Sequence, residues 1–207
     1  MKWLIPLSLL AALTLAPAHA AEISYEECIA LVKTDADAAL KKAQDWNNAG
    51  GGAAAAHCVA ISLVALNRYP DAAKVLERIA NDPTSGPTEA RATVLAQAGN
   101  AWILAEEADK ATTDLTRALE FTPGDIGIMF DRARAYLLAK KYKAALNDVN
   151  GVLLQTPSAG EPLLLRASIK KAMGDKLGAK ADAQAALSDD RISPDAADVA
   201  HGILNEP

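Results

Sequence analysis

The sequence predicts an all-α protein built from repeated pairs of helices. Of its 207 residues 51% are hydrophobic but only 4% are aromatic, because most apolar positions are Ala or Leu. Alanine has the highest helix propensity, and apolar residues recur at helical spacing along the chain. In addition, the apolar pattern of residues 92–125 returns once in each of the next two 34-residue windows. We therefore expect one helical domain of about 190 residues.

Residues 1–20 have the features of a secretion signal. Lys2 precedes an apolar run from Leu4 to Leu15, and the triplet Ala18 to Ala20 has the small-x-small spacing of a signal peptidase site. This run is short for a membrane-spanning helix of about 20 residues, although an uncleaved anchor is the alternative. We expect cleavage after Ala20, a periplasmic or secreted mature chain, and no stable membrane insertion after cleavage.

Charge and motifs argue against several classes of function. Removal of Lys2 moves the formal net charge from −5 to −6, so no basic face is expected for nucleic acid. His57 and Cys58 are adjacent and would point about 100° apart on a helix, which disfavours a catalytic pair. His57 and His201 are too few for a closed zinc site. We expect no enzyme, no metal and no cofactor, and the sequence leaves the oligomeric state open.

Residues 21–52 are predicted to form a helical pair that ends in a glycine break. The apolar residues between Ile23 and Val32 define its first helix, and Asp35 or Asp37 is the expected N-cap of the second. Three consecutive glycines at 50–52 then end the pair. We interpret residues 53–66 as the next helix.

Pro70 is expected at the first position of a helix over residues 71–80, because a missing N–H costs nothing there. Residues 82–87 contain two prolines and a glycine, which predicts a loop.

The 34-residue units carry a recognisable motif. In residues 92–125 it is formed by Gly99, Trp102, Ala111, Leu115, Ala118 and Pro123. The chain resembles the tetratricopeptide repeat (TPR) family, whose pattern is W-x2-L-G-x2-Y…A-x3-F…P. Units 126–159 and 160–193 match at the same offsets, and 53–86 matches loosely, followed by a five-residue insertion. An unrelated Ala-rich bundle is the alternative.

The resemblance implies a right-handed α-solenoid of stacked antiparallel helix pairs, with about four repeats between residues 53 and 193. Each pair leaves an apolar face that only the next pair can cover. Ser193, Pro194 and Asp195 begin a last amphipathic helix within residues 194–207, which we expect to cap the final repeat.

Two arginines share the period of the repeat. Arg132 and Arg166 occupy the same position in successive units, and each precedes an aspartate, Asp148 or Asp182, by the same interval. We predict an Arg–Asp pair that joins the two helices of each unit. The alternative is that these arginines line a ligand groove. The unit at 92–125 has Ala98 in this position and so lacks the pair.

Cys28 and Cys58 are the only cysteines. In an oxidising compartment they are expected to form one disulfide, which would join the N-terminal helices to the first repeat. Two buried free thiols are the alternative.

The resemblance also implies a concave groove lined by the first helix of each unit, which in this family takes up peptides or helices of partner proteins. By motif position its lining would be His57, Ile61, Val64, Ala96, Asn100, Ile103, Phe130, Arg134, Leu137, Leu164, Ser168 and Lys171. Asn100 alone matches the family's clamp for a terminal carboxylate. A mostly apolar groove with Asn100, Arg134 and Lys171 suits a segment with an acidic edge. Alternatively, several of these positions pack under the end helices.

The function that follows is a non-enzymatic scaffold or adaptor of the bacterial cell envelope, which binds a protein or peptide partner in its groove. The alternatives are a regulatory or accessory subunit of an envelope enzyme or assembly machine, and a small-ligand-binding protein. The adaptor hypothesis predicts that replacing Asn100 and Arg134 with alanine abolishes partner binding and preserves the fold.

Overall fold

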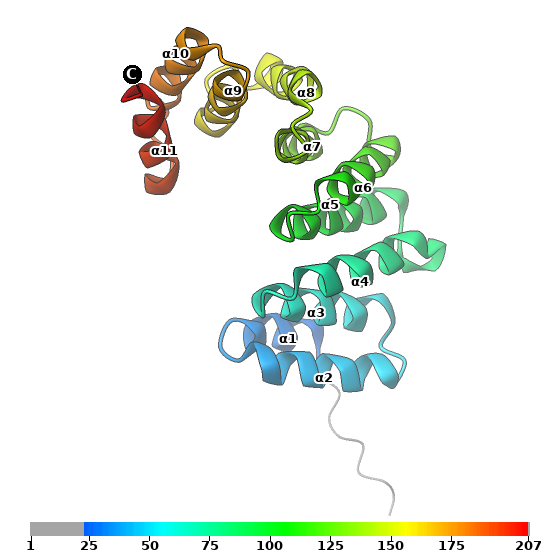
Figure 1. The fold of residues 1–207 in the computed structure, drawn as a ribbon. Helices are drawn as coiled ribbons and strands as arrows, with labels where there is room; N and C mark the ends of the chain where they lie inside the picture. The colour runs from blue at the N-terminus through cyan, green and yellow to red at the C-terminus, as the bar shows by residue number, and fades with distance from the viewer. Residues whose placement is uncertain (1–22, 207) are drawn as a thin grey trace, which may run out of the picture.

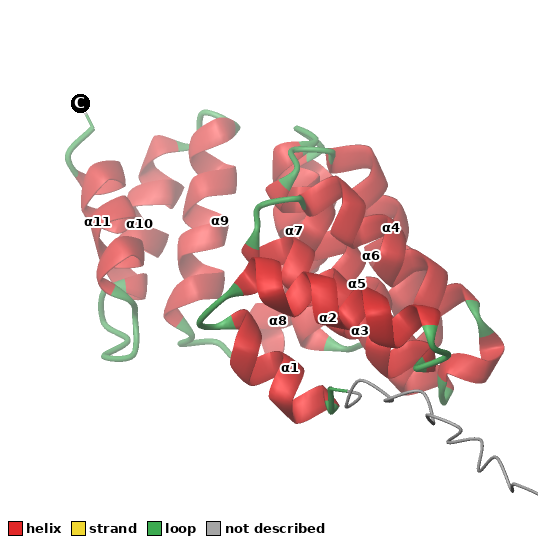
Figure 2. Ribbon diagram, turned by 90° about the horizontal axis from the view of Figure 1, so that it is seen from below, coloured by secondary structure: helices red, strands yellow, loops and turns green. Residues whose placement is uncertain are grey.

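The structure is a computed structural model that describes residues 23–206, so the predicted signal at 1–20 lies outside the described residues. Within residues 23–206 the chain forms eleven α-helices and one 3₁₀ turn, and no strand. Figure 2 shows this all-helical composition. The predicted all-α fold class is confirmed.

The helices follow one another as antiparallel pairs. They are α1 (Tyr25–Val32), α2 (Ala36–Asn48), α3 (Gly52–Ala65), α4 (Tyr69–Asn81), α5 (Thr88–Leu104), α6 (Ala108–Phe121), α7 (Ile126–Leu138), α8 (Tyr142–Gln155), α9 (Gly160–Ala172), α10 (Lys176–Ala186) and α11 (Pro194–Leu204). The pairs stack into an arc, with α5, α7 and α9 on its inner side and α6, α8 and α10 on its outer side (Figure 1). Each pair packs on the next, as a solenoid requires.

Local capping explains where the N-terminal helices begin. Ser24 and Glu27 form a reciprocal capping box at the start of α1. The carboxylate of Asp35, rather than that of Asp37, accepts a hydrogen bond of 2.9 Å from the backbone N–H of Ala38 and caps α2.

Two details around α4 differ from the prediction. Since α4 begins at Tyr69, Pro70 occupies its second position and not its first. The first-turn N–H groups are unpaired in both positions, so the proline is tolerated equally well. The loop that follows contains a 3₁₀ turn, Pro83–Ser85, in which the backbone N–H of Thr84 donates to Asp82 at 2.8 Å.

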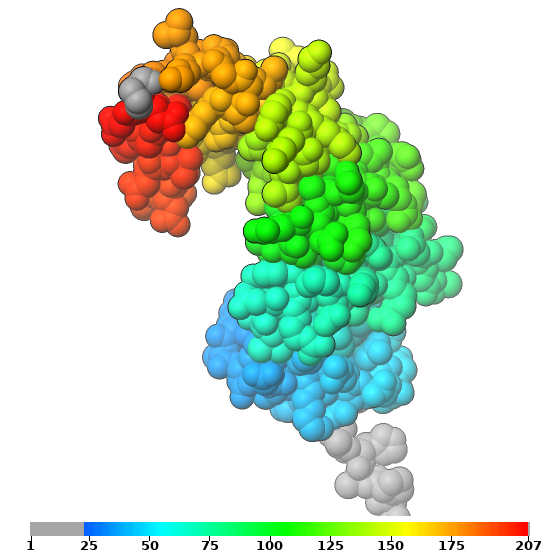
Figure 3. Space-filling view, in the orientation of Figure 1, coloured from blue at the N-terminus to red at the C-terminus, as the bar shows by residue number. Residues whose placement is uncertain are grey.

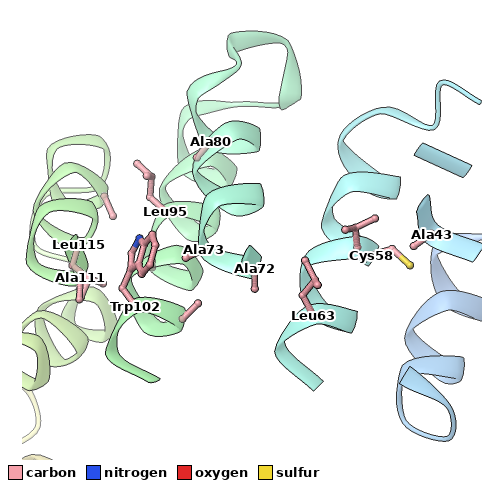
Figure 4. Packing of buried hydrophobic residues seen from close by; sticks show 14 of the residues in the cluster. Ala43, Cys58, Leu63, Ala72, Ala73, Ala80, Leu95, Trp102, Ala111 and Leu115 are labelled. Carbon is pink, nitrogen blue, oxygen red and sulfur yellow. The ribbon is translucent and has the colours of Figure 1, made fainter. Parts of the chain in front are cut away.

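Small residues set the spacing of the helices within a repeat. Ala111 and Ala118 are fully buried where α6 packs on α5. Trp102 is also buried and belongs to the same apolar cluster as Leu115 (Figure 4). A Cβ atom on Gly99 would lie 2.5 Å from Cγ of Leu115, which is closer than two non-bonded carbon atoms can approach. Position 99 must therefore be glycine for α5 and α6 to pack at this distance.

Replacing Gly99 with alanine should therefore lower the free energy of unfolding by about 1–3 kcal/mol, since the core must move to admit the methyl group. Urea unfolding followed by circular dichroism measures this. Gly202→Ala is the matched control, because a Cβ atom there meets nothing within 4 Å; it should leave stability unchanged or raise it. Equal stability of the Gly99→Ala and wild-type chains would contradict the packing described.

The last helix extends the stack. Ser193 caps α11, and Ala200 and Ile203 are buried against α9 and α10. Thus α11 occupies the place that the first helix of a further repeat would take, and it ends the arc.

Candidate functional site: the concave groove

The hollow side of the arc is visible in Figure 3, between α11 and the helices around α5. The structure places the predicted groove residues on α3, α5, α7 and α9. Ala96 and Leu164 are buried, Lys171 is exposed, and the remaining nine are partly buried. Partial burial is expected for side chains that line a groove and also pack against the adjacent first helix.

Two exposed leucines extend this lining and were not predicted from the sequence. Leu104 is 50% exposed and Leu138 is 38% exposed. Each lies four residues after a groove residue, Asn100 or Arg134, and therefore on the same helix face. They also occupy the same position in successive repeats, and that periodicity was the available signal. Together they give the groove an apolar rim at the ends of α5 and α7.

The centre of the groove is a polar network that joins two repeats. The side-chain amide of Asn100 donates to Oδ2 of Asp131 at 2.6 Å. The Nη1 atom of Arg134 lies 3.1 Å from Oδ1 of Asp131 and 3.3 Å from the amide oxygen of Asn100. Asp131 is a further groove residue that the motif did not predict, and it offsets the charge of Arg134.

At its C-terminal end the groove is bounded by α11. Lys171 pairs with the carboxylate of Glu206, and a depression of about 400 Å³ lies between α9 and α11. It is lined by Ser168, Lys171, Ala172, Val199, Gly202, Ile203 and Glu206. Ser168 and Lys171 therefore line a depression beside the end helix.

At the N-terminal end the imidazole of His57 bridges two helices. Its Nδ1 lies 2.7 Å from the hydroxyl oxygen of Tyr25 on α1, and its Nε2 lies 2.7 Å from Oε1 of Gln97 on α5. Burial of the Tyr25 ring raises the pKa of its hydroxyl. Beside this bridge is an open depression of about 430 Å³ lined mainly by small and apolar side chains.

The two periodic arginines make the contacts that their spacing suggested. Arg132 binds Asp148 through Nε and Nη2, at 2.7 and 2.9 Å. Arg166 binds Asp182 in the same bidentate way, at 2.8 and 2.7 Å. Both aspartates are buried on outer-side helices, so these pairs lie between the two layers of helices rather than in the groove.

The pairs also affect the titration of their members. The hydrogen bonds to Asp148 raise the pKa of Arg132. Burial alone would raise the pKa of Asp182, but its hydrogen bonds to Arg166 and Lys170 outweigh burial and lower it. Asp182 therefore remains an anion in the core of the solenoid.

Each of these arginines makes a second contact that the sequence did not indicate. Arg132 also reaches the hydroxyl of Thr116 on α6 at 3.4 Å, and Arg166 reaches the amide oxygen of Asn150 on α8 at 3.1 Å. In both cases the second partner belongs to the preceding repeat. The arginine thus links two repeats as well as two helices.

The cysteines are placed as a disulfide requires. Cys28 on α1 and Cys58 on α3 have Cα atoms 6.2 Å apart, and both side chains are fully buried. A bond here would fasten α1, which packs mainly on α2 and α3, to the first repeat.

Residues 23–206 offer neither a metal centre nor a membrane span. No group of three or more His, Cys, Asp or Glu residues in this part of the chain is arranged to hold a metal ion. Nor does any helix described here have the length and apolar character needed to cross a membrane.

No family model matches the sequence, and no curated protein matches it. Solved structures are similar in fold. MamA from Desulfovibrio magneticus RS-1 is 12% identical with a TM-score of 0.68, over 79% of this chain and 89% of that one. MamA from MSR-1 is 18% identical with a TM-score of 0.63, over 79% and 93% of the two chains. The Sgt2 TPR domain from Aspergillus fumigatus is 21% identical with a TM-score of 0.50, over 54% and 76%.

At these identities the similarity is one of fold. The chain is a TPR-like α-solenoid, as the repeat pattern predicted.

Proposed function

We propose that this protein is a non-enzymatic scaffold of the bacterial cell envelope that holds a segment of a partner protein in its concave groove. The observation that carries the proposal is the apolar rim formed by Leu104 and Leu138 beside the network of Asn100, Asp131 and Arg134. Isolated exposed leucines are common on protein surfaces, but two on one groove, one repeat apart, suit the apolar face of a helix or extended segment.

The charges of the groove refine the expected partner. Arg134 and Lys171 were expected to attract an acidic edge, but each already has a carboxylate partner in the chain, Asp131 and Glu206. A carboxylate of the partner would have to compete with these internal pairs. We therefore propose that apolar contacts along the rim contribute most of the affinity, and that polar contacts at Asn100 and Arg134 fix the register.

The envelope location rests on the predicted signal at residues 1–20, whose removal would leave a mature chain beginning at Ala21. The pair Cys28 and Cys58 is consistent with an oxidising compartment.

The test uses two double variants of the mature chain that carry the same chemical change. Leu104→Asp with Leu138→Asp places two charges on the groove rim. Leu154→Asp with Leu177→Asp places them on α8 and α10, where the leucines are 86% and 84% exposed. After cross-linking in an envelope extract, the rim variant should capture at least about tenfold less partner, equivalent to about 1.4 kcal/mol, and the outer variant should match wild type.

Circular dichroism and thermal unfolding establish that both variants are folded before capture is compared. Equal capture by the rim variant and wild type would contradict a role for the groove. Loss of capture in the outer variant alone would assign partner binding to the convex side.

A further inference from the structure

The junction between the first two repeats lacks the arginine that links the later ones. Arg132 and Arg166 each join an aspartate of their own repeat to a polar residue of the preceding repeat. One repeat earlier, the equivalent of the arginine is Ala98, and the equivalent aspartate is Asp114. Once the five-residue insertion between the first two repeats is taken into account, the equivalent of Thr116 is Glu77. The two positions that an arginine would join at this junction are therefore both occupied by acidic residues, Asp114 and Glu77.

Asp114 is buried and Glu77 is partly buried, and both lie where α4 and α6 pack on α5. Asp114 is 4% exposed, and its Oδ2 has no hydrogen-bond partner in the structure. Ala98 is fully buried, and its methyl group cannot reach Asp114 as the guanidinium of an arginine would. The indole Nε1 of Trp102 donates to Oε1 of Glu77 at 2.6 Å. A buried carboxylate oxygen without a donor is unfavourable, and two carboxylates close together repel.

The charged groups that face Asp114 and Glu77 offset only part of the negative charge of these two residues. From α6 itself, Nη1 of Arg117 lies 3.7 Å from Oδ1 of Asp114, but this arginine also reaches Asn81 on α4. Helix α5 contributes the uncharged indole of Trp102. The Nζ atom of Lys110 lies over this ring, 4.4 Å from its centroid. From α7, Arg132 reaches Thr116 and is bound to Asp148.

We propose that a proton shared between Asp114 and Glu77 takes the place of the missing guanidinium, and that this proton makes the junction of the first two repeats pH-sensitive. With the proton bound, one carboxyl donates to the other and the junction of α4, α5 and α6 is tight. Without it, the buried carboxylate of Asp114 and the partly buried carboxylate of Glu77 face each other, and the junction is weakened.

The electrostatics agree with this geometry. Burial, followed by the charge and hydrogen bond of Glu77, raises the pKa of Asp114 to about 7, while Arg117 and Trp102 oppose the rise. In the unfolded chain an aspartate titrates near pH 4. The folded state therefore binds the proton more tightly, and the resulting stability is complete below about pH 4 and is lost as pH rises to about 7.

The titration can be followed at the indole N–H of Trp102, which is bonded to Glu77. In the mature chain Trp46 is the only other indole expected, and Trp46→Phe assigns the signals. The NMR shift of the Trp102 N–H should titrate with a midpoint within about one unit of pH 7, and Asp114→Asn should remove that titration. An unchanged wild-type shift between pH 5 and 8.5, or a midpoint below 5, would overturn the proposal.

Stability gives a second readout on the same variants. The unfolding equilibrium constant of wild type should rise on the order of 10- to 100-fold from pH 5 to pH 8, relative to Asp114→Asn. Asp109→Asn, an exposed aspartate of the same helix, should keep the wild-type pH dependence. If Asp114→Asn does not fold, Glu77→Gln replaces it. Parallel pH profiles for wild type and the pair variant would refute the shared proton.

Discussion

Replacing Asp148 with alanine should lower the free energy of unfolding by about 3 kcal/mol. The aspartate is 2% exposed and holds the guanidinium of Arg132 through two hydrogen bonds. Its removal leaves a cation between the two layers of helices, held only by Thr116 at 3.4 Å and by the ring of Tyr136, whose centroid lies 5.6 Å from Cζ of Arg132. Because Arg132 is 20% exposed and can partly rehydrate, we expect the lower part of the range observed for broken buried pairs.

Two further variants test whether the loss of stability in Asp148→Ala comes from the unpaired buried charge of Arg132. Asp109→Ala removes an ion pair that also joins two repeats, to Lys141, but at the surface; it should cost less than about 1 kcal/mol. Replacing both Arg132 and Asp148, with leucine and alanine, removes both charges and should recover most of the stability. If Asp148→Ala unfolds at the same urea concentration as wild type but fails to bind a partner, the pair has a binding role instead.

Reduction of the proposed Cys28–Cys58 bond should lower the free energy of unfolding by about 3–4 kcal/mol, since the cysteines are separated by 30 residues. The bond closes a loop that contains the end of α1, all of α2 and the first half of α3, and its loss increases the freedom of the unfolded chain. In the folded state α1 has eight residues and is held to α3 otherwise by packing and by the contact of Tyr25 with His57. We therefore expect α1 to become the first part of the chain cleaved by protease.

The measurement compares urea unfolding of one preparation with and without a dithiol reductant, which changes no residue. A double Cys→Ala variant should match the reduced protein and should not respond to the reductant. A thiol assay on protein purified without reductant and then denatured can contradict this prediction. Two reactive thiols would show that the bond does not form.

The architecture was predictable because the repeat imposes a period on independent columns of residues. Alanines at 111, 145 and 179 fix the register, and the register fixes which face of each helix is buried. The Arg–Asp contacts followed from the same register, since an equal separation of arginine and aspartate in two repeats reflects an equal geometry. Helix starts depended on local capping, and here the sequence left Asp35 and Asp37 as equal alternatives.

Side-chain partners across repeats were harder to predict. Asp131 lies at a position that the groove motif did not mark, and its contact with Asn100 depends on how α5 and α7 pack. The pairing of Lys171 with Glu206 depends on the place of α11, which the motif does not cover. The role of Glu77 was missed because the five-residue insertion after residue 86 breaks the 34-residue period. Glu77 therefore does not lie 34 residues before its equivalent in the next repeat, Thr116.

The central claim is that a partner segment lies in the groove beside Leu104. A photoreactive amino acid placed at position 104 of the mature protein tests it most directly, with position 154 on the outer side of the solenoid as the matched site. We predict a discrete cross-linked partner from position 104 and none from position 154. Cross-links of equal yield from both positions, or from position 154 alone, would contradict the claim.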